Sequence, residues 1–192
     1  MKKAILVSAF CVFLIIVSLM QIFAIPLMSV VTLKSPLAQG GYNWCWVASG
    51  ATVVRFQKGA TIPPSVKDFA IKGTGLTNPP DLQYFNSNII DGADAYGVKL
   101  TLSGSMTFSA VQTQIASAKK PFILGWMWKN TYQGGHKVTV YGYDSEVGQI
   151  LAYWNSCIGF GPNANPAKGE YRLENYNDIK NGAMRQWDST LK

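Results

Sequence analysis

The front half of the chain is patterned as helices. Between residues 44 and 57 apolar positions are dense enough for a largely buried helix with Cys45 at its start. Two shorter helices are predicted, over 63–71 and 79–96, because each range begins at a pair of prolines and Gly97 stops the second. We therefore expect a group of short helices in this half.

From residue 98 the apolar positions follow the spacing of strands. The predicted elements are a strand over 98–102, a helix over 108–118 capped by Thr107 or Ser109, a strand over 121–126, a hairpin of 137–143 and 149–154, and a last strand over 169–173. Helices followed by an antiparallel sheet indicate an α+β domain, in which the helix that starts at Cys45 packs against the sheet.

Residues 1–33 have a different pattern, because Lys2 and Lys3 precede a long apolar run. The charged start is typical of a signal peptide, whose apolar region has about 7–15 residues, and this run is longer. A run of about 20 apolar residues spans a bilayer, so an uncleaved membrane anchor is the second interpretation. In either case the rest of the chain, residues 34–192, is predicted to be one secreted or extracytoplasmic domain.

Composition and charge exclude several classes of function. The formal net charge of +7 falls to +5 without Lys2 and Lys3, and the other basic residues are scattered singly, with no stripe typical of nucleic-acid binding. Membrane contact is predicted only through the N-terminal segment. After residue 33 the chain has two cysteines and one histidine, which are too few for a disulfide framework or a zinc site. We predict no metal or cofactor, and the oligomeric state stays open.

Cys45 and His136 are the candidate chemical groups. A thiol at a helix start lies near unpaired backbone N–H groups and the positive end of the helix dipole, which favour the thiolate. His136 is the one histidine of the chain and precedes a strand, so it is the one imidazole that can act as base. The alternative is structural, with Cys45 a small buried residue and His136 a packed or exposed side chain.

Three segments resemble the active-site motifs of papain-like cysteine peptidases, in bacterial forms such as the C39-like peptidases. The first is Gln39-Gly40-Gly41-Tyr42-Asn43-Trp44-Cys45-Trp46, the second is Gly135-His136 with the strand after it, and the third is Tyr153-Trp154-Asn155-Ser156. The resemblance implies a papain-like fold. It also implies Cys45 as nucleophile, His136 as base, Asn155 as acceptor from the Nδ1–H group of His136, and Gln39 in the oxyanion hole.

Some alternatives stay open. Asp144 is a rival for the third position of the triad, although it is predicted to lie in the hairpin loop. Cys157 is a rival nucleophile that lacks a helix start and a preceding glutamine. The predicted function is hydrolysis of a peptide or protein substrate. A papain-like transglutaminase, a peptidoglycan amidase and a catalytically silent peptide-binding module are the alternatives.

Overall fold

The computed structural model describes residues 25–192, apart from 42, 64, 83–84, 130–133 and 160–163. Most of the predicted signal peptide or anchor, residues 1–24, lies outside the described residues, as does Tyr84 of the predicted second short helix. Among the helices that are described, none combines the length and the hydropathy that a membrane span requires.

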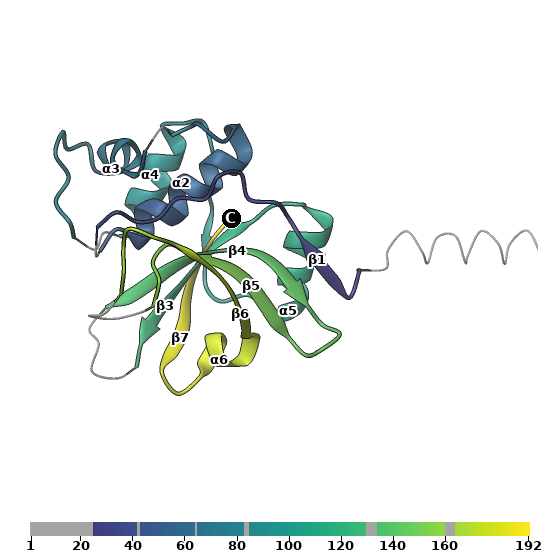
Figure 1. Ribbon diagram of the computed structural model, residues 1–192. Coiled ribbons are helices and arrows are strands. Elements are labelled where there is room, and N and C mark those ends of the chain that lie inside the picture. The colour runs from purple at the N-terminus through teal and green to yellow at the C-terminus, as the bar shows by residue number, and fades with distance from the viewer. Residues whose placement is uncertain (1–24, 42, 64, 83–84, 130–133, 160–163) are drawn as a thin grey trace, which may run out of the picture.

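The described residues form short helices and one antiparallel sheet of seven strands (Figure 1). The helices are α2 (Cys45–Lys58), α3 (Val66–Thr74), α4 (Asn86–Asp94), α5 (Phe108–Gln112), which continues as the π-helical turn η1 (Thr113–Ser117), and α6 (Tyr176–Asn181). The strands are β1 (Met28–Val30), β2 (Leu102–Ser103), β3 (Phe122–Trp128), β4 (Gly135–Asp144), β5 (Ile150–Asn155), β6 (Glu170–Asn175) and β7 (Arg185–Leu191). Their order is β2-β7-β3-β4-β5-β6, with β1 paired to β4. The predicted α+β fold is confirmed.

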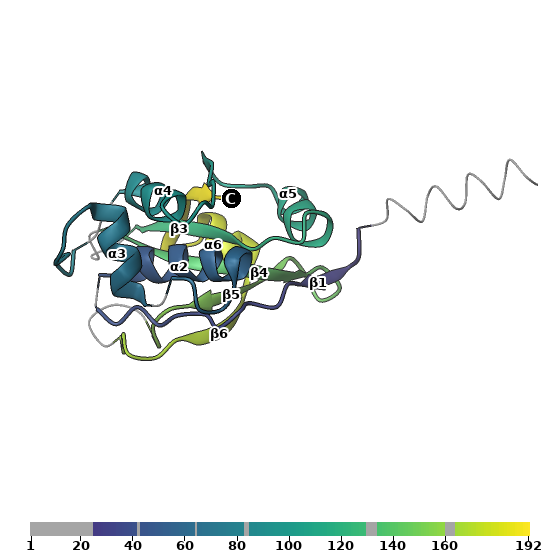
Figure 2. The same ribbon diagram turned by 90° about the horizontal axis from the view of Figure 1, so that it is seen from above.

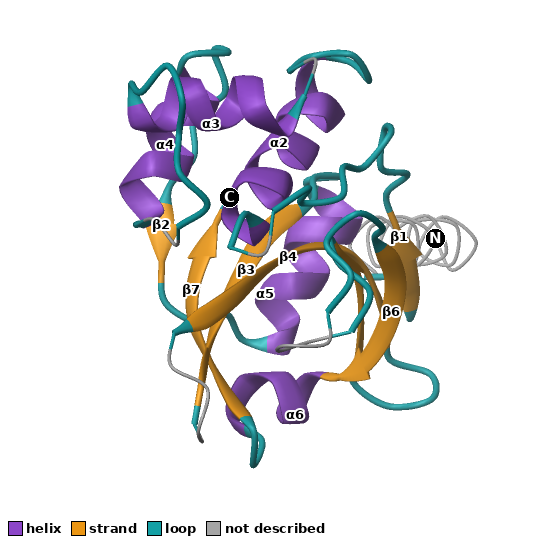
Figure 3. Ribbon diagram, turned by 60° about the vertical axis from the view of Figure 1, so that its left-hand side comes forward, coloured by secondary structure: helices purple, strands orange, loops and turns teal. Residues whose placement is uncertain are grey.

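Two apolar cores lie on the two faces of this sheet. Phe122 and Leu124 of β3 pack into a core with α5 and α6, whereas Ile123 between them packs into a core with α2, α3 and α4. In Figures 1 and 2, α2, α3 and α4 gather at one side of the molecule and α5 lies beside β1, and in Figure 3 the sheet curves around α5. Because helices cover both faces, β3 has a continuous apolar run without polar alternation.

The predicted helix over 79–96 is wrong at its start, since α4 begins at Asn86. Residues 80–82 instead form a connector, which we call the 80–82 strap, and its carbonyl oxygens accept hydrogen bonds from the segment around Cys45. The indole Nε1–H groups of Trp44 and Trp46 donate to the carbonyl oxygens of Pro80 and Leu82, at 3.1 and 3.2 Å. A helical conformation would use these carbonyls internally, so bonding to the start of α2 replaces the first turns of the predicted helix.

The Asp81 side chain completes this strap. Its carboxylate accepts from the backbone N–H of Asn43 at 2.8 Å, while the Asn43 side chain donates to the Asp81 carbonyl at 3.1 Å. The strap thus holds Asn43 and Trp44 before Cys45 and Trp46 after it. The strap fixes the approach of the chain to the start of α2.

The predicted strand over 98–102 is wrong at its start, because pairing with β7 begins at Leu102, next to two backbone hydrogen bonds between Thr101 and Lys192. Val98 and Leu100 are buried in the core with α2, and the Val98 N–H donates to Ala93 of α4. The helix predicted over 108–118 is confirmed as α5 and η1, and the Thr107 hydroxyl caps it by accepting from Ala110 N–H at 3.2 Å. The hairpin and the strand near 169–173 correspond to β4, β5 and β6.

Both ends of the described chain add strands that the sequence pattern did not predict. Strand β1 lies within the segment assigned to targeting, and it pairs with β4 while Val31 and Leu33 after it are buried. Strand β7 lies between β2 and β3, with the Trp187 ring stacked on Phe122 at 6.1 Å between centroids. Three polar residues separate Trp187 from Leu191 in β7, so the segment lacks the alternation that predicts a strand.

Candidate active site

Cys45 is the first residue of α2, and its side chain is buried. The sequence prediction of a cysteine at a helix start is therefore confirmed. The backbone N–H groups of this first turn have no partners within the helix, so they present partial positive charge to the sulfur. The 80–82 strap holds the residues on both sides of Cys45, which fixes the sulfur relative to the sheet.

The hairpin of β4 and β5 brings His136 and Asn155 together. His136 is the second residue of β4 and Asn155 the last of β5, and both side chains are buried. The distance from His136 Nε2 to Asn155 Oδ1 is 2.7 Å. Since a carbonyl oxygen can only accept, Nε2 carries the hydrogen and donates it. The predicted contact between these residues exists, but through Nε2 and not Nδ1.

The orientation of the His136 ring at the start of β4 explains why Nε2, and not Nδ1, meets Asn155. With Nε2 bonded to Asn155, Nδ1 is the nitrogen left to exchange a proton with the Cys45 sulfur. Asp144, the rival for the third position, lies at the opposite end of β4, where its carboxylate accepts from the Glu146 N–H at 2.7 Å. It is a loop-forming residue and not part of the site.

The Asn155 amide is itself held in one orientation. Its Nδ2 donates to the Glu170 carboxylate at 3.2 Å and to the Gly159 carbonyl at 3.4 Å. The Gly159 N–H donates to the same carboxylate oxygen at 3.1 Å. Because the amide NH₂ is engaged on that side, Oδ1 must face His136. Glu170, at the start of β6, is a positioning residue that the sequence motifs did not indicate.

Charge in the site favours a thiolate and an imidazolium. Burial raises the pKa of the Cys45 thiol, but the charge of His136 and hydrogen bonds from His136 and the Lys137 backbone outweigh it, so the pKa lies below its ordinary 9.0. Burial lowers the pKa of His136, whereas the charge of Cys45 and hydrogen bonds with both thiols raise it above its ordinary 6.5. Between these two pKa values the pair is ionised.

Gln39 lies behind the site, on the chain that leads to α2. Its side chain is buried, and the Ser156 hydroxyl donates to Gln39 Oε1 at 3.0 Å. The Gln39 backbone N–H also donates to the Ser156 carbonyl at 2.9 Å. Two bonds thus tie Gln39 to the residue after Asn155, and they orient the amide so that its NH₂ group points away from Ser156. Gln39 is not among the residues that line the cavity described below.

Cys157 is buried beside the His136–Asn155 pair. Its sulfur lies 3.6 Å from Asn155 Oδ1 and 3.3 Å from the Gly159 carbonyl oxygen. Cys157 therefore faces the site, and in the structure it is a free thiol, as is Cys45. It lies in the segment that follows β5 and not at a helix start.

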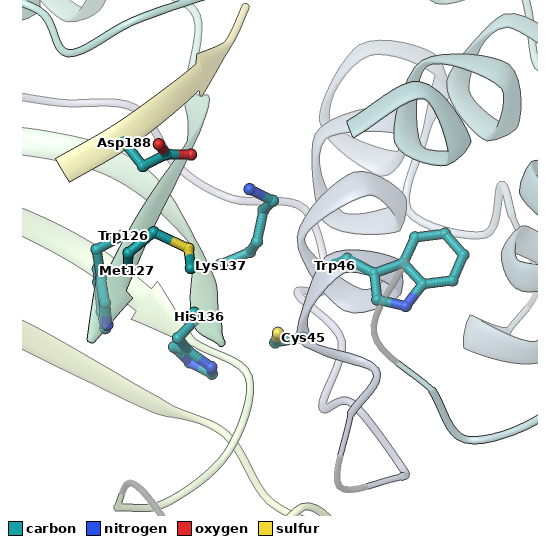
Figure 4. A pocket seen from close by; sticks show the side chains of 8 residues that line it. Cys45, Trp46, Trp126, Met127, His136, Lys137 and Asp188 are labelled. Atoms are coloured by element: carbon teal, nitrogen blue, oxygen red, sulfur yellow. The ribbon is translucent and has the colours of Figure 1, made fainter. Parts of the chain in front are cut away.

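A cavity of about 110 Å³ opens between the start of α2, the end of β3, the start of β4 and the middle of β7. Its lining includes Cys45 and His136, together with Trp126, Met127, Gly135, Lys137 and Asp188, and the backbone of Trp46, whose indole points away (Figure 4). The Trp126 ring lies 5.3 Å from the His136 ring, between centroids. No sequence signal indicated Lys137 or Asp188 as residues of this cavity.

Comparison with known proteins supports the resemblance drawn from the motifs. The model of the Peptidase_C39 like family matches residues 24–184, which include every motif residue and most of the domain. No curated protein sequence matches the chain.

The ionised pair predicts a characteristic pH dependence. The Cys45 thiolate exists above its lowered pKa and is lost by protonation at lower pH, while the imidazolium exists below the raised pKa of His136 and is lost at higher pH. Iodoacetamide should therefore alkylate Cys45 well below pH 9, and His136→Gln should shift the midpoint upward. Rates followed by peptide mapping across pH measure this, and identical profiles for the two proteins would contradict it.

Proposed function

Since the chain belongs to the Peptidase_C39 like family, we propose that it is a cysteine peptidase with Cys45 as nucleophile, His136 as base and Asn155 as orienting residue. The observation that carries the proposal is the 2.7 Å hydrogen bond between His136 and Asn155, next to a thiol of lowered pKa. Peptide hydrolysis by this route needs a thiolate and a proton donor at the same carbonyl group.

In the proposed reaction the Cys45 thiolate attacks the carbonyl carbon of a peptide bond. The C=O π electrons move to oxygen, and a tetrahedral oxyanion forms. The His136 imidazolium then gives its Nδ1 proton to the leaving amine as the C–N bond breaks, which leaves a thioester on Cys45. Neutral His136 next takes a proton from water, and the hydroxide so formed attacks the thioester; the C–S bond breaks, the thiolate is restored, and the acyl group leaves as a carboxylic acid that loses its proton to solvent.

Asn155 supports both steps by keeping the ring in one plane. A bond from Nε2–H to Asn155 Oδ1 persists whether Nδ1 is protonated or not, so the ring need not turn between the two proton transfers. Glu170 and Gly159 hold the amide that accepts this bond. The role of Asn155 is therefore orientation and not proton transfer.

We propose that Gln39 and the backbone N–H of Cys45 stabilise the oxyanion. The Ser156 hydroxyl occupies Gln39 Oε1, which leaves the Nε2–H group as the donor side of the amide. The Cys45 N–H, at the first position of α2, has no helical acceptor. Donors of this kind act on charge that appears only during the reaction.

The proposed substrate is a peptide or protein outside the cytoplasm. Export is inferred from Lys2-Lys3 and the apolar run after them, which fit a signal peptide or a membrane anchor. Fractionation of cells that produce the full chain tests this point, and recovery of the domain from the cytoplasm alone would contradict export.

Hydrolysis of a peptide library by the purified protein tests the triad. Cys45→Ala is expected to abolish cleavage, and Asn155→Ala to lower kcat by roughly 10- to 100-fold, because the imidazole loses its fixed plane. Asp144→Asn is the matched control and should leave kcat unchanged, since Asp144 lies at the far end of β4.

Three results would contradict the triad: equal activity of wild type and Cys45→Ala, loss of activity in Asp144→Asn, or no cleavage by wild type. Amine incorporation instead of hydrolysis would indicate a transglutaminase. Release of cell-wall fragments would indicate an amidase.

Gln39→Ala separates the oxyanion role from thiolate formation. Loss of one oxyanion donor typically lowers kcat by about 10²–10³-fold. Alkylation by iodoacetamide forms no oxyanion, so the rate at Cys45 should stay within roughly twofold of wild type. A parallel fall of both rates would show that Gln39 acts only through the fold. Ser156→Ala, which removes the partner of Gln39 Oε1, should show a smaller loss of kcat than Gln39→Ala.

A further inference from the structure

Lys137, the residue after His136, places an ammonium group in the wall of the cavity. Its side chain is partly buried and runs from β4 across β3 to β7, where Nζ donates to the Ser189 hydroxyl at 3.0 Å. Figure 4 shows this side chain between Cys45 and Asp188. The papain-like motifs assign Lys137 no role, so its position needs a separate account.

The sheet is built to accommodate this side chain. Gly125 of β3 pairs with Lys137 on one side and with Ser189 on the other. A Cβ atom at residue 125 would lie 2.3 Å from Lys137 Nζ and 2.6 Å from Ser189 Oγ. Any larger residue at 125 would therefore displace the ammonium group or its tether. The glycine leaves room for a lysine that reaches across the strand.

The ammonium group has hydrogen-bonding capacity to spare. Ser189 is a neutral acceptor and takes one of the three N–H groups. In the described part of the chain no carboxylate forms an ion pair with Lys137. Asp188 lines the same cavity and is exposed; its charge and that of the Cys45 thiolate favour the ammonium form of Lys137, whereas burial lowers the pKa of Lys137 below its ordinary value. Among the described residues, the Lys137 ammonium thus faces the cavity without an ion pair to a carboxylate.

On the side of β3 the cavity wall is apolar. Trp126 and Met127 line the side formed by β3, and Gly135 contributes only backbone. A charge in such surroundings interacts more strongly with a bound ion than it would in water. An anionic group that enters beside Lys137 would therefore gain a partner.

We propose that Lys137 makes this cavity a carboxylate-binding subsite, which selects substrates that carry a carboxylate next to the bond that Cys45 attacks. The proposal rests on the proposed peptidase function for its biological meaning. The carboxylate has two sources, an acidic side chain or the end of a peptide chain, and both present the same group to the ammonium. Lys137 is thus a specificity-determining residue.

Two alkylating reagents of nearly equal size test the subsite without a peptide substrate. Iodoacetate and iodoacetamide both transfer a carbon to the Cys45 thiolate and release iodide, but only iodoacetate carries a carboxylate. The measured quantity is the ratio of the two rates at Cys45, by peptide mapping of the full chain. Lys137→Met should lower this ratio by roughly tenfold, the size expected for loss of one nearby charge at partial burial.

Three variants complete the design. Lys137→Arg keeps the positive charge and should keep most of the ratio, and Lys180→Met removes a lysine of α6, outside the cavity, and should leave the ratio unchanged. Ser189→Ala keeps Lys137 but removes its tether, so it should give an intermediate ratio even if Lys137→Met fails to fold. Equal ratios in wild type, Lys137→Met and Ser189→Ala would overturn the subsite.

Peptide pairs then identify the source of the carboxylate. One pair has Glu or Gln beside the cleaved bond, and the other has a free or an amidated C-terminus. The preference in kcat/KM for one acidic member should disappear in Lys137→Met, and absence of any preference in wild type would overturn the substrate claim. Failure of the peptidase proposal would differ, because wild type would cleave none of the peptides while the alkylation ratio still depended on Lys137.

Discussion

The hydrogen bond from His136 to Asn155 joins two strands that are separated by a loop, and the site depends on it. Because β4 and β5 are antiparallel neighbours, the start of one and the end of the other meet at the same edge of the sheet. That edge faces the start of α2, where Cys45 lies. The sheet thus fixes the base, the helix fixes the thiol, and their separation is set by packing of the helix on the sheet.

Two segments outside the motifs maintain this arrangement. The 80–82 strap holds the residues on both sides of Cys45 through the indoles of Trp44 and Trp46. On the other side, Glu170 orients the Asn155 amide. Trp44 and Trp46 of the motif therefore have a structural role that is separate from the chemistry. The strap acts on the residues beside Cys45, and Glu170 acts on the amide that accepts from His136.

Sequence signals predicted those elements that depend on residues close together in the chain. The apolar density around Cys45, the Thr107 cap and the hairpin of β4 and β5 depend on neighbours along the chain, and the structure confirms them. The order of the motifs also identified the family, which the family match confirms. Contact between His136 and Asn155 followed from the hairpin, because strand pairing converts sequence spacing into proximity.

The remaining features depend on contacts between distant segments. Pro79 and Pro80 predicted a helix start, but the carbonyls of Pro80 and Leu82 bond to side chains 36 positions earlier in the chain. Strand β7 is stabilised by pairing with β3 and not by its own pattern, so Asp188 and the tether of Lys137 could not be placed. Which ring nitrogen meets Asn155 depends on the angle of the strand end, which spacing does not encode.

Labelling with an epoxysuccinyl inhibitor, which modifies activated cysteine nucleophiles, tests the central claim most directly. The full chain would be labelled as wild type, Cys45→Ala and His136→Ala, and the modified residue identified by peptide mapping. The account predicts that Cys45 alone is modified and that labelling falls sharply in His136→Ala. Labelling at Cys157, or equally slow labelling of both thiols whether or not His136 is present, would contradict it.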